Sequence, residues 1–304
     1  MNSNLKNWFL LARVPFFSPA LFPFLLGSLL AAQTVPAFNW PVLVISLCAV
    51  TSIILACHLN GEIDDLETDR ISATLERNRF SGGSQILVKK LIPQQQVQWV
   101  IHLATIIAVL LGLILQFGLN RGALTIPLGM IAIFCAWFYS KPPLRLVSRG
   151  VGEIMVAFCY GWLPITVAFY LQTGEFSSLA NLLAIPVGLS CFNVILINEF
   201  ADYPADQQTG KRNLVVRFGK PFARKLYLLT NLVSWFALYL LYTSNNLPLF
   251  AALFYLPFLI MALKTSRLLI TKKDKDPEQL EQACGSTILI NLGTTLSLIL
   301  SLVN

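Results

Sequence analysis

The sequence predicts an all-α protein that crosses a membrane about nine times, and three observations carry this prediction. Hydrophobic residues make up 56% of the 304 positions and charged residues only 12%, with a mean hydropathy of +0.67. Apolar stretches recur along the chain, and many approach the roughly 20 residues that a helix needs to cross the hydrocarbon core. The Lys and Arg residues gather in alternate connections between these stretches. A single transmembrane domain over residues 1–304 is expected.

The apolar stretches are expected to be helices, most of them separated by short turns. They cover residues 15–33, 38–59, 96–118, 122–140, 151–171, 178–199, 224–243, 246–264 and 282–303. Two interruptions, 60–95 and 200–223, are long and polar, and the one at 264–281 is strongly charged. The first segment has three prolines in its apolar core and is followed by eight more segments, which favours a retained helix over a cleaved signal peptide.

The distribution of basic residues predicts the orientation of the chain. With a cytoplasmic N-terminus, nine crossings place the connections after the second, fourth, sixth and eighth segments on the cytoplasmic side. These connections and the N-terminus hold all but one of the 22 Lys and Arg residues, the exception being Arg121. The positive-inside rule therefore predicts a cytoplasmic N-terminus. The net charge of +7 indicates a membrane surface or an anionic substrate as the partner of the basic residues, and no nucleic-acid partner is expected.

A first acidic cluster, "NGEIDDLETDR" at residues 60–70, follows the second apolar segment. Asn60 and Asp64 are four positions apart, as are Asp65 and Asp69, and residues at this spacing share one face of a helix. Glu67 shares no face with Asn60 and Asp64, so we expect it to face solvent. The sequence thus predicts two rows of oxygen ligands at one helix end.

A second cluster, "INEFADYPAD", begins at residue 197 and closes the sixth apolar segment. Asn198, Asp202 and Asp206 follow one another at steps of four, with Glu199 beside them. Pro204 predicts either a kink in this helix or a new short helix capped by Asp202. Both clusters follow even-numbered segments, so both are expected on the cytoplasmic side.

Carboxylate and amide oxygens of this kind suit Mg²⁺, which is typically held by one or two carboxylates together with substrate phosphates. A diphosphate bridged between the two clusters through Mg²⁺ is therefore the expected guest. The alternative is that these are solvated acids that cap helices. Two other functional classes are considered. A transporter would place its polar groups near the midplane, not at helix ends, and a CDP-alcohol phosphotransferase would carry an Asp-Gly-x-x-Ala-Arg motif, which is missing here.

Four stretches resemble the UbiA superfamily of intramembrane prenyltransferases, namely the two acidic clusters with the tail "GKRNLVVRFG", "RFSGGS" and "FYSKPPLRLVSRGVGEIMVAFCYGWLP". The resemblance implies a bundle of nine transmembrane helices, open toward the lipid, in which both motifs bind an isoprenyl diphosphate through Mg²⁺. Asp202 and Asp206 match the second motif. The family's first motif is Asn-Asp-x-x-Asp-x-x-x-Asp. Asn60 and Asp64 fit its opening, but Thr68 stands where an Asp is expected and Asp69 comes one residue late. Whether Asp64 or Asp65 reaches the metal stays open.

Basic groups near the clusters are expected to bind the diphosphate and stabilise its charge as it leaves. The candidates are Arg13, Arg77, Arg79, Lys141, Arg145, Lys211 and Arg212, of which Lys141 is also a candidate for catalysis. Each of them could instead be an ordinary positive-inside charge. Tyr139 either presents its ring to a prenyl carbocation or belongs to the interfacial aromatic belt. Glu153 is expected to pair with Arg149 or to face the cavity.

The resemblance implies transfer of a polyprenyl group from its diphosphate to a small aromatic acceptor. The "GKRNLVVRFG" and "FSGGS" stretches look most like the members that prenylate 1,4-dihydroxy-2-naphthoate in menaquinone or phylloquinone synthesis. Other family acceptors share the diphosphate machinery and stay open, among them 4-hydroxybenzoate, homogentisate, chlorophyllide, haem and glycerol lipids. The glycines of "RFSGGS" either bring backbone amides to a phosphate or form a simple turn. The sequence does not predict an oligomeric state.

Overall fold

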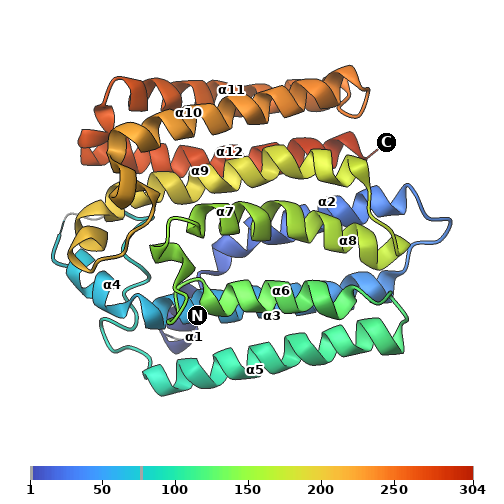
Figure 1. The fold of residues 1–304 in the computed structure, drawn as a ribbon, viewed down its shortest axis with the longest axis horizontal. Helices are drawn as coiled ribbons and strands as arrows, with labels where there is room; N and C mark the ends of the chain where they lie inside the picture. Colours follow the sequence, from blue (N-terminus) through green and yellow to red (C-terminus); the bar gives the residue numbers. More distant parts are fainter. Residues whose placement is uncertain (1–2, 76–77, 304) are drawn as a thin grey trace.

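The computed structural model describes residues 3–75 and 78–303, and within these ranges it contains helices and no strands. Long helices lie side by side in a bundle (Figure 1). They are α1 (Ser3–Leu11), α2 (Ser18–Ala32), α3 (Trp40–Asp64), α4 (Leu66–Ser72), α5 (Gln94–Leu113), α6 (Thr125–Phe138), α7 (Gly152–Ala157), α8 (Leu163–Thr173), α9 (Ser178–Gln208), α10 (Leu214–Thr243), α11 (Leu249–Ile270) and α12 (Pro277–Ser301).

Eight helical stretches among the described residues are long and apolar enough to cross a membrane, which makes the chain a multi-pass membrane protein. The predicted segment 122–140 differs from the other eight because its helix, α6, has only 14 residues. At about 1.5 Å per residue such a helix rises roughly 20 Å, which is less than the thickness of the hydrocarbon core. The all-α bundle is therefore confirmed, with α6 as a short ninth apolar helix.

The first predicted segment begins with a corner. Arg13 adopts a left-handed conformation, with φ 52° and ψ 44°, between α1 and the short 3₁₀ helix η1 (Val14–Phe17). Pro15 then fixes the first turn of η1, and α2 follows directly. This corner leaves the Arg13 side chain beside α3, where it reaches the first acidic cluster.

Helix α9 runs from Ser178 to Gln208 with Pro204 inside it, so the alternative of a new short helix capped by Asp202 is wrong. The acidic second cluster thus extends the same helix that crosses the bundle. Helix α10 begins six residues later and is interrupted at Gly219, whose φ of 79° and ψ of 159° are not helical.

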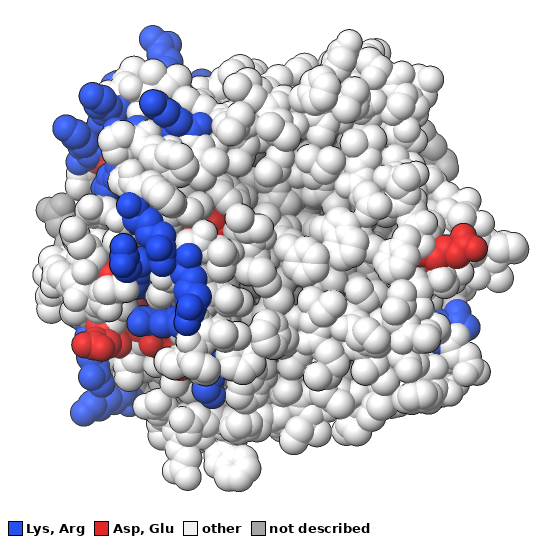
Figure 2. Space-filling view, viewed as in Figure 1, with Lys and Arg blue, Asp and Glu red and all other residues white. Residues whose placement is uncertain are grey.

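One end of the bundle carries most of the charge. Figure 2 shows Lys and Arg side chains gathered there with acids among them, while the opposite end carries few charged side chains. This is the end at which α4 lies and toward which α3 and α9 run (Figure 1). Helix α4 packs against α9, so the two acidic clusters, more than a hundred residues apart in sequence, come together.

Candidate active site

The first acidic cluster does not form one continuous helix. Helix α3 ends at Asp64, and at Asp65 the backbone turns, with φ −94° and ψ 8°, into the short helix α4. Within α4, the hydroxyl of Thr68 donates a hydrogen bond to that of Thr209 over 3.1 Å, just past the end of α9. The turn at Asp65 therefore folds the second half of the cluster onto the second motif.

Lys211 joins the two motifs. Its Nζ lies 3.1 Å from Asp65 Oδ2 and 3.9 Å from Asp206 Oδ1. Burial alone would lower the pKa of Lys211, but Asp65, Asp206 and Asp202 together raise it above its ordinary value. Arg145 approaches Asp65 from another side, with 3.9 Å between its terminal nitrogen and Oδ1. A fixed positive charge thus lies between carboxylates of both motifs.

Glu62 is a site residue that reasoning from the sequence did not single out. Its side chain is 1% exposed and accepts hydrogen bonds from Arg13 Nε over 2.7 Å and from the Ser84 backbone over 3.0 Å. Glu62, Asp65 and Asp69 follow one another at steps of three and four, which is the acid spacing of the family motif when it begins at Gly61 and not at Asn60. This spacing was visible in the sequence, but a glutamate stands in the first aspartate position.

Asn60 and Asp64 lie on another face of α3, away from Lys211. With Lys141 they line a separate small pocket of about 70 Å³, whose remaining walls are Ile63, Gln98, Ile101, His102 and Trp137. The Lys141 ammonium lies 4.6 Å from the centre of the Trp137 ring. In this pocket the amide nitrogen of Asn60 and Oδ2 of Asp64 are buried without a hydrogen-bond partner. Of the two open candidates, Asp65 is thus the one that faces the second motif.

The "RFSGGS" loop connects the two motifs through its backbone. The Gly82 amide donates to Asp202 Oδ1 over 2.9 Å, and the Ser84 amide and hydroxyl donate to Glu62. Gly83 has a φ of +65°, and a Cβ at this position would lie 1.9 Å from Asp69 Oδ2. The loop amides of Gly82 and Ser84 therefore hold motif carboxylates, a role that differs from both expected roles.

Asp69 is buried among other acids. Burial, together with the charges of Glu62 and Asp65, raises the pKa of Asp69 to about 7, while Arg13 and Lys211 oppose this shift. An acid in such surroundings ionises readily only when more positive charge is brought to the site.

The oxygen atoms of the site suit a magnesium ion that is shared with phosphate oxygens, since among the described residues no three Asp, Glu, His or Cys side chains are grouped so as to hold a metal alone. Asp65 Oδ1, Asn198 Oδ1 and Asp206 Oδ1 are buried without a hydrogen-bond partner. Two of them have only an ion pair of 3.9 Å, from Arg145 to Asp65 and from Lys211 to Asp206. Buried polar atoms in folded proteins are normally hydrogen-bonded, so these three oxygens can accept a further partner. Hard carboxylate and amide oxygens are the ligands that Mg²⁺ prefers.

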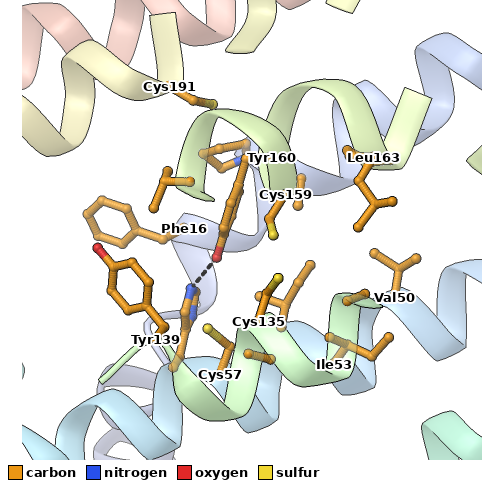
Figure 3. Close-up of a pocket in the computed structure, with 18 of the residues that line it drawn as sticks. Phe16, Val50, Ile53, Cys57, Cys135, Tyr139, Cys159, Tyr160, Leu163 and Cys191 are labelled. Carbon is orange, nitrogen blue, oxygen red and sulfur yellow. Dashed lines mark hydrogen bonds between the residues drawn. The ribbon is translucent and has the colours of Figure 1, made fainter. Parts of the chain in front are cut away.

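A cavity of about 470 Å³ begins at this site and continues between the helices. Arg13, Asp65, Tyr139 and Asn198 line it near the motifs, and aliphatic and aromatic side chains line most of the remainder. Figure 3 shows Val50, Ile53 and Leu163 along one part of it, with Tyr139 and Phe16 at the other. The arrangement is suited to an amphiphile with an anionic head at the carboxylates and a long apolar chain in the cavity.

The other predicted residues lie as follows. Arg79 lines the cavity and forms an ion pair of 2.6 Å with Glu281, whereas Arg212 is exposed and Arg77 lies outside the described residues. Glu153 is fully buried and accepts a hydrogen bond of 2.7 Å from the Leu214 amide. The expected pair with Arg149 does not form, because Arg149 donates to the carbonyls of Leu144 and Pro143. Glu67 is exposed, as expected.

This chain forms an intramembrane helical bundle with two acidic motifs at one end, and comparisons with known proteins identify the family to which such a fold belongs. The profile of the UbiA prenyltransferase family matches residues 20–286. A 1,4-dihydroxy-2-naphthoate octaprenyltransferase from Haemophilus influenzae is 32% identical over 72% of this chain and 71% of that protein. A 2-carboxy-1,4-naphthoquinone phytyltransferase from Synechocystis sp. is 26% identical over 74% of this chain and 70% of that protein.

Solved structures share the fold at low sequence identity. A UbiA homologue from Aeropyrum pernix superposes with a TM-score of 0.68 at 14% identity, over 93% of this chain and 96% of that one. A UbiA homologue from Archaeoglobus fulgidus, solved with GPP and Mg²⁺, gives a TM-score of 0.59 at 15% identity, over 97% of this chain and 99% of that one. The chain belongs to the UbiA prenyltransferase family and is a membrane prenyltransferase. Family membership favours prenyl transfer over the transporter and the CDP-alcohol phosphotransferase.

Proposed function

We propose that the protein transfers a polyprenyl group from an isoprenyl diphosphate to 1,4-dihydroxy-2-naphthoate in a Mg²⁺-dependent reaction. The observation that carries the proposal is the position of Lys211 between Asp65 and Asp206, beside an apolar cavity that Asp65 lines. An anionic head group and a long hydrocarbon chain are both accommodated by this arrangement. The named activities of two relatives support the choice of a naphthoate acceptor.

In this proposal Asp65 and Asp69 of the first motif and Asn198, Asp202 and Asp206 of the second hold the metal. Mg²⁺, when bound, neutralises charge on the diphosphate and so makes it a better leaving group. Asn60 and Asp64 are left out of this set because they line the separate pocket. Glu62 orients Arg13, because the Ser84 backbone fixes the Glu62 carboxylate, and this carboxylate forms an ion pair with Arg13.

The cationic side chains act on the diphosphate. Lys211 and Arg145, which neutralise Asp65, are close enough to the motifs to bind phosphate oxygens, and Arg13 has a side chain 41% exposed at the cavity. Fixed charges of this kind stabilise the negative charge that develops as the allylic C–O bond breaks. Tyr139 presents its ring to the same end of the cavity, where a carbocation is stabilised by a π face. The apolar walls keep water from the cation.

The proposed orientation places the N-terminus and both motifs on the cytoplasmic side, in the cytoplasmic membrane if the chain is bacterial. It rests on the charged end of the bundle in Figure 2 and on the positive-inside rule. A soluble aromatic acceptor then reaches the site from the cytoplasm, and the prenyl chain from the bilayer.

The test uses the full-length protein in liposomes, with labelled prenyl diphosphate, Mg²⁺ and a panel of aromatic acceptors. The proposal expects product only with Mg²⁺ and most product with 1,4-dihydroxy-2-naphthoate. Asp202→Asn protein, inserted to the same level, is the matched control and should be inactive. A clear preference for 4-hydroxybenzoate or a lipid acceptor would overturn the acceptor, and Mg²⁺-independent turnover would overturn the metal.

A further inference from the structure

A hydrogen-bonded pair, His58 and Tyr160, lines the cavity. His58 Nε2 lies 3.1 Å from the Tyr160 hydroxyl, and His58 Nδ1 lies 3.0 Å from the Ala12 carbonyl oxygen (Figure 3 shows the first of these). Phe17 packs edge-on against the imidazole at 5.3 Å between ring centres. The proposed metal and diphosphate site does not use either member of the pair.

The direction of these hydrogen bonds follows from their partners. A carbonyl oxygen only accepts, so Nδ1 of His58 carries the hydrogen and, in a neutral ring, Nε2 is left as an acceptor. A charged imidazole would need a carboxylate in this apolar wall, and none of the ion pairs among the described residues includes His58. Tyr160 therefore donates its only proton to His58, and its oxygen offers the cavity lone pairs alone.

The surroundings of Tyr160 make this oxygen distinctive. Cys57, Cys159 and Cys191, all weak hydrogen-bonding groups, lie near it at the cavity wall, and Tyr139 lies beside them (Figure 3). Tyr160 belongs to a π-helical turn, η4 (Phe158–Trp162), between α7 and α8. Such turns are rare and are found frequently at functional sites, because they redirect side chains.

The pair also lies at a useful distance from the motifs. His58 and Asp65 are seven residues apart and both line the cavity, so they occupy one face of the chain at the end of α3. Seven residues of helix rise about 10 Å, which leaves room for a small ring system between them. Tyr139, at the same end of the cavity as Asp65, lines this space as well.

We propose that Tyr160, held by His58, accepts a hydrogen bond from a hydroxyl group of the aromatic acceptor and thereby selects hydroxylated rings. The inference rests on the proposed prenyl transfer and adds the residues that recognise the acceptor. The bond orients the ring so that its hydroxyl points toward Tyr160 and a ring carbon points toward the diphosphate end. Tyr160 is a specificity-determining residue, and His58 acts through it by fixing the direction of its proton.

The test compares a hydroxylated acceptor with its methyl ether, which cannot donate. Tyr160→Phe should raise the KM for the hydroxylated acceptor roughly tenfold or more, the loss expected for a buried hydroxyl without a partner. The KM for the methyl ether and the binding of labelled prenyl diphosphate should stay unchanged. Tyr227→Phe is the matched control, because it removes another buried tyrosine hydroxyl, one bonded to Thr287 over 2.8 Å and outside the cavity.

A second variant reverses the preference. In His58→Leu the Tyr160 hydroxyl is free to donate into the cavity. The KM for the methyl ether should therefore fall relative to the KM for the hydroxylated acceptor. An unchanged KM for the hydroxylated acceptor in Tyr160→Phe would overturn the proposal. So would an equal rise in KM for both acceptors together with weaker binding of prenyl diphosphate. If instead the unaltered protein forms no prenylated product with any acceptor, the proposed function itself fails, and the two failures are thus distinguishable.

Discussion

The ammonium group of Lys211 lies 3.1 Å from Asp65 and 3.9 Å from Asp206, and so links two acidic motifs that are 141 positions apart when counted from Asp65 to Asp206. Asp65 belongs to the turn after α3, and Asp206 to the end of α9. The lysine follows Asp206 by five residues and folds back over it. Lys211 is therefore a cation shared by the two motifs, in addition to Arg145 and Arg13 at the first.

Replacing Lys211 by Ala should lower prenyl transfer roughly tenfold or more, because a positioned cation is lost from the leaving-group site. Lys211→Arg should retain part of the activity. The measurement is steady-state turnover in liposomes, with Lys273→Ala, a change of an exposed lysine at the charged end, as the control. Equal turnover of the Lys211→Ala and Lys273→Ala variants would show that Lys211 only neutralises Asp65.

Changes in the second motif should abolish turnover without preventing insertion, but the choice of substitution matters. Asp206 is 1% exposed and accepts a hydrogen bond of 2.7 Å from Asn213, so it is not an exposed loop acid. We expect Asp206→Asn to be inactive and folded, whereas Asp206→Ala should also lose stability. Thermal unfolding and turnover, measured side by side with Asp202→Ala, separate the two effects. Activity in any of these variants at limiting Mg²⁺ would remove that residue from the site.

The first motif should show a clear ranking. Asp65→Ala should cost roughly tenfold or more in turnover, Asp64→Ala less, and Glu67→Ala almost nothing, because of these three residues Asp65 is the one that contacts Lys211 and Glu67 is exposed. Helical spacing counted along the sequence predicts instead that Asp64 joins Asn60 in the metal site. A larger loss for Asp64 than for Asp65 would restore that assignment and assign the small pocket to the reaction.

A methyl group at Gly83 should disrupt the loop that joins the motifs. The new Cβ would lie 1.9 Å from Asp69 Oδ2 at a φ of +65°, so Gly83→Ala should lose both stability and activity. Gly174→Ala is the matched control, because Gly174 has a φ of +79° and no neighbour within 4 Å of a Cβ. In the control the free energy of unfolding should fall only by the cost of a left-handed backbone conformation at alanine, about 1 kcal/mol. Thermal unfolding of both variants checks this; equal losses would mean that the contact with Asp69 relaxes freely.

Metal affinity should depend on pH through Asp69, whose pKa is raised to about 7. In the metal-free protein the folded state holds this proton more tightly than the unfolded chain, so the group lowers the free energy of unfolding as pH rises from about 4 to about 7. Mg²⁺ binding requires the ionised form. The Mg²⁺-induced rise in Tm should therefore be larger at pH 8 than at pH 6, and Asp69→Asn should reduce the difference. A pH-independent rise in the unaltered protein would exclude Asp69 as a ligand.

The sequence by itself determined the helical bundle, the charged end and the two acidic motifs. Each of these depends on local composition and spacing: long apolar runs must be helical in lipid, and basic connections alternate with them. The spacing of Asp202 and Asp206, one helical turn apart, was visible in the sequence, although only the structure shows that α9 continues through Pro204. The exposure of Glu67 also followed from helical spacing.

Only the tertiary structure decided which residues of the first motif face the second. The backbone turns at Asp65, so that Asn60 and Asp64, which share a helix face by spacing, line a separate pocket while Asp65 contacts Lys211. Glu62 is buried because Arg13, at a left-handed corner 49 residues earlier, pairs with it. The contacts of Gly82 and Ser84 with acids of two different helices are equally non-local. Such pairings depend on how distant segments pack, and periodicity within one segment carries no information about them.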